Sequence, residues 1–175
     1  MNFIKNNKYY LLTALTLVVI VAIKIIDAYI ITDACSGIGA YELAKDFDKS
    51  QQMLNTWTPN AKLWVAFDLG FDYLFILLYV SFIAISIYKI IQKLPATRHL
   101  LIIVGTILMY AQFIAGIFDG IENYLLLKIL LGDQNTNTPN NAFWFASIKF
   151  AIVGLALLYI IVTATLYRKL IFGKK

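Results

Sequence analysis

The sequence contains very few of the residues that proteins use for metal and redox chemistry. Its 175 residues include one cysteine, Cys35, and one histidine, His99. A single cysteine excludes an internal disulfide and cysteine-pair redox chemistry within one chain. No histidine or cysteine lies deep in an apolar stretch, which argues against zinc, haem and most di-iron sites. A catalytic triad is not recognisable either, because the serines of these stretches have no histidine partner.

Charged residues are also scarce. They make up 14% of the chain, whereas a soluble domain has about a quarter. Hydrophobic residues make up 61%, and the mean hydropathy is +0.75. Four apolar stretches are long enough to cross a bilayer, which takes roughly 20 residues; they cover approximately residues 9–31, 61–91, 99–131 and 141–167. We therefore expect one all-α domain over residues 1–175, a bundle of four transmembrane helices in a lipid bilayer.

The basic residues indicate how the chain is oriented in the membrane. The net charge is +5, and nine of the 15 Lys and Arg residues, but none of the ten acids, flank the spans on one side. By the positive-inside rule this side is cytoplasmic, which predicts an inner-membrane protein with both termini in the cytoplasm. This placement favours contact with anionic lipid headgroups and argues against nucleic acid as a partner. The nine residues are Lys5, Lys8, Lys89, Lys93, Arg98, Arg168, Lys169, Lys174 and Lys175.

Residues 32–60 form the longer of two outer loops, and loops of this size usually carry function or structure of their own. One mostly apolar set recurs at helical spacing: Tyr41, Ala44, Phe47, Gln51 and Leu54. A polar set takes another face: Glu42, Lys45, Asp46 and Lys49. The pattern predicts a short amphipathic helix on the outer surface. Such a helix either packs against the bundle or covers a pocket.

Seven formally charged residues lie inside the predicted spans and away from their ends; each charge costs about 2.5–3.5 kcal/mol at the centre of an inserting helix. They are Lys24, Asp27, Asp68, Asp72, Asp119, Glu122 and Lys149. At 1.5 Å per residue, all seven lie roughly 6–18 Å below the outer boundary of the membrane. The four spans therefore place their charges in one layer of the outer half.

Helical spacing gathers these groups on faces that should point inward. One set follows at i, i+4 and i+8 on the second span: Trp64, Asp68 and Asp72. Another shares a sector of the third span: Gln112, Asp119, Glu122 and Asn123. Lys24 and Asp27 are three residues apart on the first span. Gly116 and Gly120 form a G-x-x-x-G around Asp119, a spacing that permits close helix approach.

The layer carries an excess of negative charge. Lys24 and Lys149 supply two positive charges against five carboxylates, which leaves three unpaired. Buried carboxylates without partners either take up protons or bind a cation. We therefore expect a pocket that opens on the outer side and binds a cation, a proton, or a cationic or lipid ligand. The predicted ligand-binding residues are Lys24, Asp27, Trp64, Asp68, Asp72, Gln112, Asp119, Glu122, Asn123 and Lys149.

Two alternatives stay open. In the first, four carboxylates ligate Mg²⁺, Ca²⁺ or Mn²⁺ in a metal-dependent enzyme that acts on lipid, because these ions prefer oxygen ligands; the ligands would be Asp68, Asp72, Asp119 and Glu122. In the second, the charges form an ion-pair lattice that locks the helices of a structural or accessory subunit. The sequence pattern predicts neither a particular enzymatic activity nor a particular oligomeric state.

Two segments of the C-terminal half carry a resemblance. "FDGIENYLLL" contains a D-x-x-E-N element in the third span, and "WFASIKFAIVGLALLY" contains a K-F pair in the fourth. The residues concerned are Asp119, Glu122, Asn123, Lys149 and Phe150. In these elements the chain is similar to a loose group of uncharacterised bacterial four-span membrane proteins. The resemblance implies an integral membrane protein and no particular activity.

Overall fold

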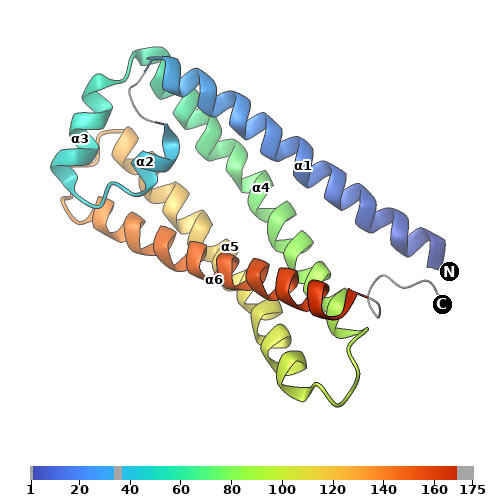
Figure 1. Cartoon of the computed structure of the whole chain (residues 1–175). Coiled ribbons are helices and arrows are strands. Elements are labelled where there is room, and N and C mark those ends of the chain that lie inside the picture. Colours follow the sequence, from blue (N-terminus) through green and yellow to red (C-terminus); the bar gives the residue numbers. More distant parts are fainter. Residues whose placement is uncertain (1, 34–36, 169–175) are drawn as a thin grey trace.

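A computed structural model describes residues 2–33 and 37–168, which form six helices and no strand. Four helices are long (Figure 1): α1 (Asn2–Asp33), α4 (Pro59–Ile91), α5 (His99–Leu130) and α6 (Thr138–Leu166). Two short helices lie between α1 and α4 in the chain: α2 (Ile38–Glu42) and α3 (Phe47–Thr56). Cys35 lies outside the described residues. The predicted all-α bundle of four spans is confirmed.

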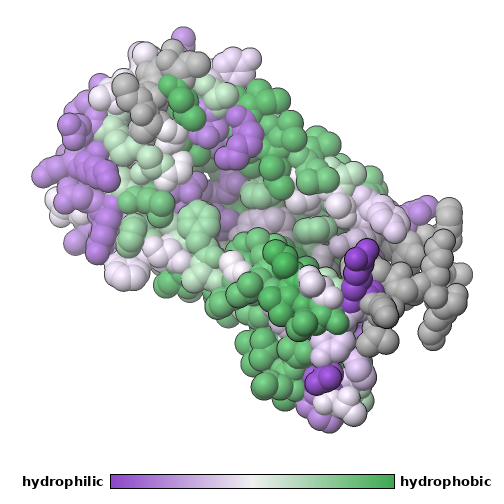
Figure 2. Space-filling model, viewed as in Figure 1, coloured by the Kyte–Doolittle hydropathy of each residue, from purple (hydrophilic) through white to green (hydrophobic). Residues whose placement is uncertain are grey.

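Each long helix contains a stretch that is long and apolar enough to cross a membrane: Asn7–Ile31, Pro59–Ile91, His99–Leu130 and Thr138–Leu166. The side chains that point away from the bundle are also apolar; Leu77, for example, is 69% exposed and Ile107 is 62% exposed. A large hydrophobic surface is visible over much of the bundle in Figure 2. Helices that are apolar on their outer as well as their inner faces are typical of membrane spans. The chain is therefore a multi-pass membrane protein.

Local signals in the sequence set the ends of several helices. The Thr58 hydroxyl accepts the backbone N–H of Ala61 at 3.1 Å, and Pro59 occupies the first turn of α4. The chain leaves α4 at Ile91, shortly before Pro95, which cannot donate a backbone hydrogen bond. These signals explain why α4 begins and ends where it does.

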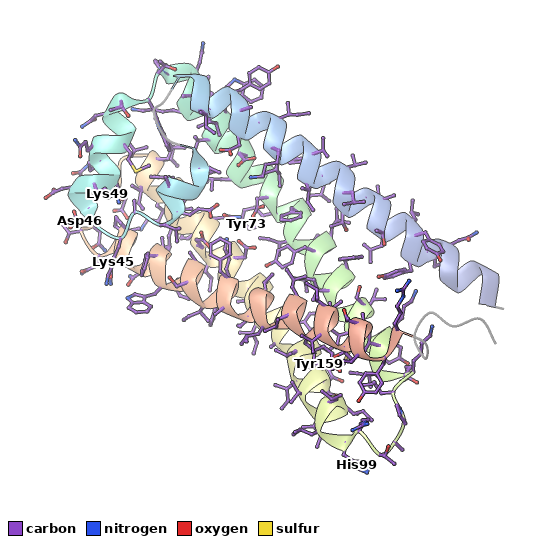
Figure 3. All side chains as sticks on the ribbon, in the orientation of Figure 1. Lys45, Asp46, Lys49, Tyr73, His99 and Tyr159 are labelled. Carbon is purple, nitrogen blue, oxygen red and sulfur yellow. The ribbon has the colours of Figure 1, made fainter. Side chains whose placement is uncertain are left out.

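The segment between α1 and α4 forms two helices where the sequence predicted one. The chain breaks between them because Asp46 has an extended backbone conformation, and its carboxylate accepts the N–H groups of Asp48 and Lys49 as the N-cap of α3. Tyr41 and Leu54, from the predicted apolar face, are buried as expected. Asp46 and Lys49 point outward at this end of the molecule (Figure 3).

The α2 and α3 helices lie at one end of the bundle, here called the α2–α3 end (Figure 1). The start of α1, the end of α6 and the α4–α5 connection lie at the opposite end. Basic side chains pack on tyrosine rings there: the Lys89 ammonium is 3.5 Å from the ring centroid of Tyr9, and the Arg98 guanidinium is 5.7 Å from that of Tyr167. The basic residues Lys169, Lys174 and Lys175 lie outside the described part of the chain.

Helix α4 holds the bundle together, because α1 and α5 both pack along it, and α5 also packs along α6. Ring stacking secures α1 near both ends: Tyr9 stacks with Phe82 at 5.9 Å, and Tyr29 stacks with Trp64 at 5.2 Å. Over residues 2–33 and 37–168, α1 has no comparable packing against α5 or α6. Figure 1 shows α1 and α6 well separated.

Two hydrophobic clusters fill the bundle, one toward each end. The cluster at the α2–α3 end combines Tyr41 and Trp57 with Leu69 of α4 and Leu126 of α5. The other cluster lies toward the opposite end, and on α4 it begins at Ile76. Along α4 the acidic residues fall where the first cluster gives way to the second. The intramembrane charges therefore lie in a layer between two apolar cores.

A close approach between α5 and α6 generates a stability prediction. A methyl group on Gly105 would clash with the hydroxyl oxygen of Tyr159, which is buried and donates to the Leu101 carbonyl at 3.0 Å. Gly105→Ala therefore has to displace the ring, and we expect a loss of about 1–3 kcal/mol of stability. The measurement is the Tm of the purified protein in detergent.

Gly154→Ala on α6 is the matched control, because a methyl group there meets no atom within 4 Å. Its Tm should equal or exceed that of the wild type, since alanine has the higher helix propensity. Equal Tm values for Gly105→Ala and the wild type would mean that α5 and α6 pack less tightly than described.

Candidate functional site

A cavity of about 570 Å³ lies within the bundle, bordered by α1, α4, α5 and α6 and, at one end, by α2. The charged and amide residues that line it lie toward the α2–α3 end: Lys24, Asp27, Glu42, Asp68, Asp72, Asp119, Asn123 and Lys149. The remaining lining is mostly apolar and continues toward the opposite end. In Figure 2 this face of the molecule is hollowed between α1 and α6, with hydrophilic residues in its depth.

Lys149 is the main counter-charge inside the bundle. Its Nζ lies 2.5 Å from Oδ1 of Asp119 and 2.6 Å from Oε2 of Glu122. All three side chains are almost completely buried. The Tyr79 hydroxyl donates to Oδ2 of Asp119 at 2.8 Å, so the contact extends to α4. We call Lys149, Asp119 and Glu122 the Lys149 triad; it joins α5 to α6, and Tyr79 joins it to α4.

Two further carboxylates that line the cavity are engaged by protein donors. The Asn123 amide donates to Oδ2 of Asp72 at 2.7 Å, which links α4 and α5 next to the triad. Asp27 accepts the backbone N–H of Ile38 at 3.1 Å, which holds the start of α2 against α1. Neither contact brings a positive charge to the carboxyl group, because an amide donor has no formal charge.

Asp68 differs from the other acids of the layer. It is only 3% exposed, it lines the cavity, and its Oδ1 is buried without a hydrogen-bond partner. No ion pair involves Asp68 in the part of the chain that the structure describes. A buried carboxyl group without a partner carries a full desolvation cost. Asp68 is therefore a buried carboxyl group whose desolvation is offset neither by an ion pair nor by a hydrogen bond to Oδ1.

Glu42 is a cavity residue that the sequence prediction missed, since the predicted amphipathic helix put it on the polar outer face with Lys45. The prediction was wrong here because α2 has only five residues, too few to show a helical period. Burial raises the pKa of the Glu42 carboxyl to about 7. The nearby Lys149 ammonium lowers this pKa, while three carboxylates on other helices raise it further, namely Asp72, Asp119 and Asp27.

Tyr79 was also missed, although the sequence contained a signal for it. It follows Asp72 by seven residues, which places both on one face of α4. The G-x-x-x-G faces α4 as well: a methyl group on Gly116 would lie 2.9 Å from Val80, and Tyr73 donates to the Gly120 carbonyl at 2.9 Å. The small residues therefore bring α5 close to α4 beside the triad.

Seven of the ten predicted site residues line the cavity: Lys24, Asp27, Asp68, Asp72, Asp119, Asn123 and Lys149. Glu122 belongs to the triad and does not line the cavity. Trp64 is 38% exposed and stacks on Tyr29 outside it. Gln112 is buried and donates to the Leu108 carbonyl of its own helix at 3.1 Å. That these residues bind a ligand stays a prediction.

The charges around the cavity do not balance. Counting Glu122, six carboxyl groups face two lysines, an excess of four negative charges. Among residues 2–33 and 37–168, no three His, Cys, Asp or Glu side chains form a group that could hold a metal ion. His99 lies at the opposite end from Asp46 and Lys49 (Figure 3). The predicted metal ligands do not converge, because Lys149 holds Asp119 and Glu122 while Asn123 holds Asp72.

No protein-family model, no curated protein and no solved structure matches the chain. The fold and the cavity themselves define its class. It is an integral membrane protein of four spans with a cavity among its helices that is lined at one end by acidic residues.

The triad generates a stability prediction. Lys149→Met leaves Asp119 and Glu122 buried without a positive partner, and breaking a buried pair from one side costs about 3–5 kcal/mol. We expect a large fall in the Tm of the purified protein. Replacing all three triad residues, as Lys149→Met with Asp119→Asn and Glu122→Gln, should restore part of the loss, because the triad then contains no unpaired charge.

Lys128→Met is the control for the triad. It breaks a partly exposed pair in which Lys128 Nζ lies 3.2 Å from Asp133 Oδ2. A surface pair of this kind contributes little to stability, because water and salt screen it. If Lys149→Met were no less stable than Lys128→Met, the triad would not hold the helices together.

Glu42 generates a pH prediction. Its pKa of about 7 in the folded protein lies above the ordinary 4.5, so folding favours the protonated form. The stability that this group contributes is complete below pH 4.5 and is lost as the pH rises through 7. Glu42→Gln does not titrate, and it should melt about 2–4 °C above the wild type on the alkaline side of this window, as a change of about 1 kcal/mol would produce.

Below pH 4.5, Glu42→Gln and the wild type should have the same Tm. The measurement is the Tm of both proteins across the pH range. Asp48→Asn removes an exposed carboxyl from α3 and serves as the control, because its difference from the wild type should not vary with pH. A constant difference between Glu42→Gln and the wild type would show that Glu42 does not titrate near neutral pH.

Proposed function

We propose that the protein binds a cationic group, a protonated amine carried by a ligand, at the acidic end of its cavity. The observation that carries the proposal is Asp68, a carboxyl group only 3% exposed that lines the cavity and has no hydrogen-bond partner for Oδ1. A cation beside Asp68 offsets the cost of burying that charge. Asp72 and Glu42 line the same cavity and make its potential more negative.

An organic cation suits this geometry better than a bare metal ion. Metal ions such as Ca²⁺ require several converging oxygen ligands, and no such group occurs among residues 2–33 and 37–168. A volume of about 570 Å³ is large for one ion but ordinary for an organic ligand, whose sites measure about 300–1,000 Å³. The size and the charge of the cavity therefore support an amine.

A structural role for part of the charged layer is supported by a separate observation. Lys149 contacts two carboxylates at 2.5 and 2.6 Å, which leaves little of its charge for a ligand. We infer that the Lys149 triad locks α5 to α6, while Asp68, Asp72 and Glu42 bind. The structural role and the binding role are thus assigned to different residues.

We propose that the α2–α3 end faces outward and that both termini lie in the cytoplasm of a cell with an inner membrane. Basic residues at the opposite end support this orientation through the positive-inside rule; they include Lys8, Lys89, Lys93, Arg98 and Arg168. The acidic end of the cavity would then lie in the outer half of the membrane.

The test is thermal unfolding of the purified protein with butylammonium, Na⁺, Mg²⁺, Ca²⁺ or Mn²⁺ chloride. We expect butylammonium to raise the Tm of the wild type, since a ligand present at about 100 times its Kd stabilises by about 2.7 kcal/mol. Asp68→Asn should abolish this increase. Without ligand, Asp68→Asn should melt at or above the wild-type Tm, because it removes an unpaired buried charge.

Asp133→Asn is the control, since Asp133 lies in the α5–α6 connection outside the cavity and its substitution should leave the butylammonium effect intact. An equal effect of butylammonium on Asp68→Asn and the wild type would sink the proposal. A response to Mg²⁺, Ca²⁺ or Mn²⁺ alone would favour the metal alternative. No response to any cation would leave only the structural role.

A further inference from the structure

The cavity continues well beyond its acidic end. Thr13 and Asp27 of α1 both line it, and at 1.5 Å per residue they lie about 20 Å apart along the helix. Toward Thr13 the lining has no charged residue and is mostly apolar, with Leu17 and Ile20 on α1, Phe82 on α4, and Val153 and Leu157 on α6. The cavity therefore has an acidic end and a long apolar end.

The apolar end lies along the direction of the lipid chains. The residues that line it belong to spans, so its long axis follows α1 and α4 through the membrane. About 20 Å is some two thirds of the hydrocarbon thickness of a bilayer. A hydrocarbon chain lying in this cavity would thus be parallel to the chains of the surrounding lipid.

The side of the cavity between α1 and α6 faces the bilayer. Helix α1 packs along α4, and its described residues have no comparable packing against α6. The hollow in Figure 2 lies between these two helices. A molecule dissolved in the membrane can therefore reach the cavity sideways, without passing through water.

We propose that the ligand is an amphiphile with an ammonium head and a long hydrocarbon chain, the head beside Asp68 and the chain between α1 and α6. The inference rests on the proposed function for its head, and it adds the chain and the route. The polar lining at one end and the apolar lining at the other match the two parts of such a molecule. A short amine would leave the apolar end unused.

The first experiment compares butylammonium with hexadecylammonium in phosphatidylcholine nanodiscs. A long hydrocarbon chain partitions into the bilayer whether or not it binds the protein. The affinity of each amine is therefore compared between protein variants, and not between the two amines. Val153→Phe fills the apolar end of the cavity. It should weaken the binding of hexadecylammonium about tenfold, the change that about 1.4 kcal/mol produces, and change the affinity for butylammonium by no more than about twofold.

Val162→Phe is the matched control, because Val162 is 44% exposed on the same helix and does not line the cavity. It should change neither affinity. The Tm of each variant without ligand is measured first, and Leu157→Phe replaces Val153→Phe if that protein does not fold. If both amines bind the wild type and filling the apolar end weakens neither, the chain assignment fails while the cation site stands. If neither amine binds, both proposals fail.

The second experiment locates the chain directly. Hexadecylamine with a diazirine at the chain end is photolysed in the nanodisc, and the labelled peptides are identified by mass spectrometry. Label should fall on residues 13–20 of α1 or 153–157 of α6, excess hexadecylamine should remove it, and Asp68→Asn should reduce it. Uncompeted label on lipid-facing positions such as Leu77 would overturn the inference, and equal competition by hexadecanol would overturn the ammonium head.

Discussion

The rest of the structure depends on the contact between Lys149 and two carboxylates of α5. A charge in hydrocarbon is costly, and an opposite charge close to it offsets much of that cost. Lys149 has two such partners, Asp119 and Glu122, and Tyr79 adds a hydrogen bond from α4. Three helices thereby share one depth in the membrane. Helix α1 has no part in this contact, and the cavity lies where α1 faces the other three.

The position of the charged layer between two apolar clusters explains why it stays polar without disrupting the bundle. The clusters supply the packing on either side, so the layer itself does not have to hold the helices by apolar contact. Within the layer, amide and hydroxyl donors satisfy single oxygens of Asp72 and Asp119 but supply no positive charge. Acids with an ion pair and acids without one therefore coexist within one short section of the bundle.

The sequence predicted the four spans and the charged layer because both follow from regular helix geometry. A span must be about 20 residues long, and the rise per residue converts position into depth. Trp64 was predicted to belong to the pocket but lies outside it for a geometric reason: each step of four residues turns about 40° on a helix, so Trp64 lies about 80° from Asp72. Glu42 escaped the prediction because tertiary packing, not periodicity, turns a five-residue helix toward the cavity. Which acids are paired and which are unpaired could be decided only from the contacts in the structure.

Glu42 lies on a connecting segment, whereas the triad lies on the spans, so the two parts of the site differ in how readily they accept substitutions. The triad lies on packed spans, where a substitution disturbs several helices at once. Connecting segments accept substitutions and insertions more readily than the elements they join. A change in α2 can therefore alter the charge and the shape of one end of the cavity while the intramembrane framework stays fixed. The α2 segment is thus the part of the cavity lining that can change most freely.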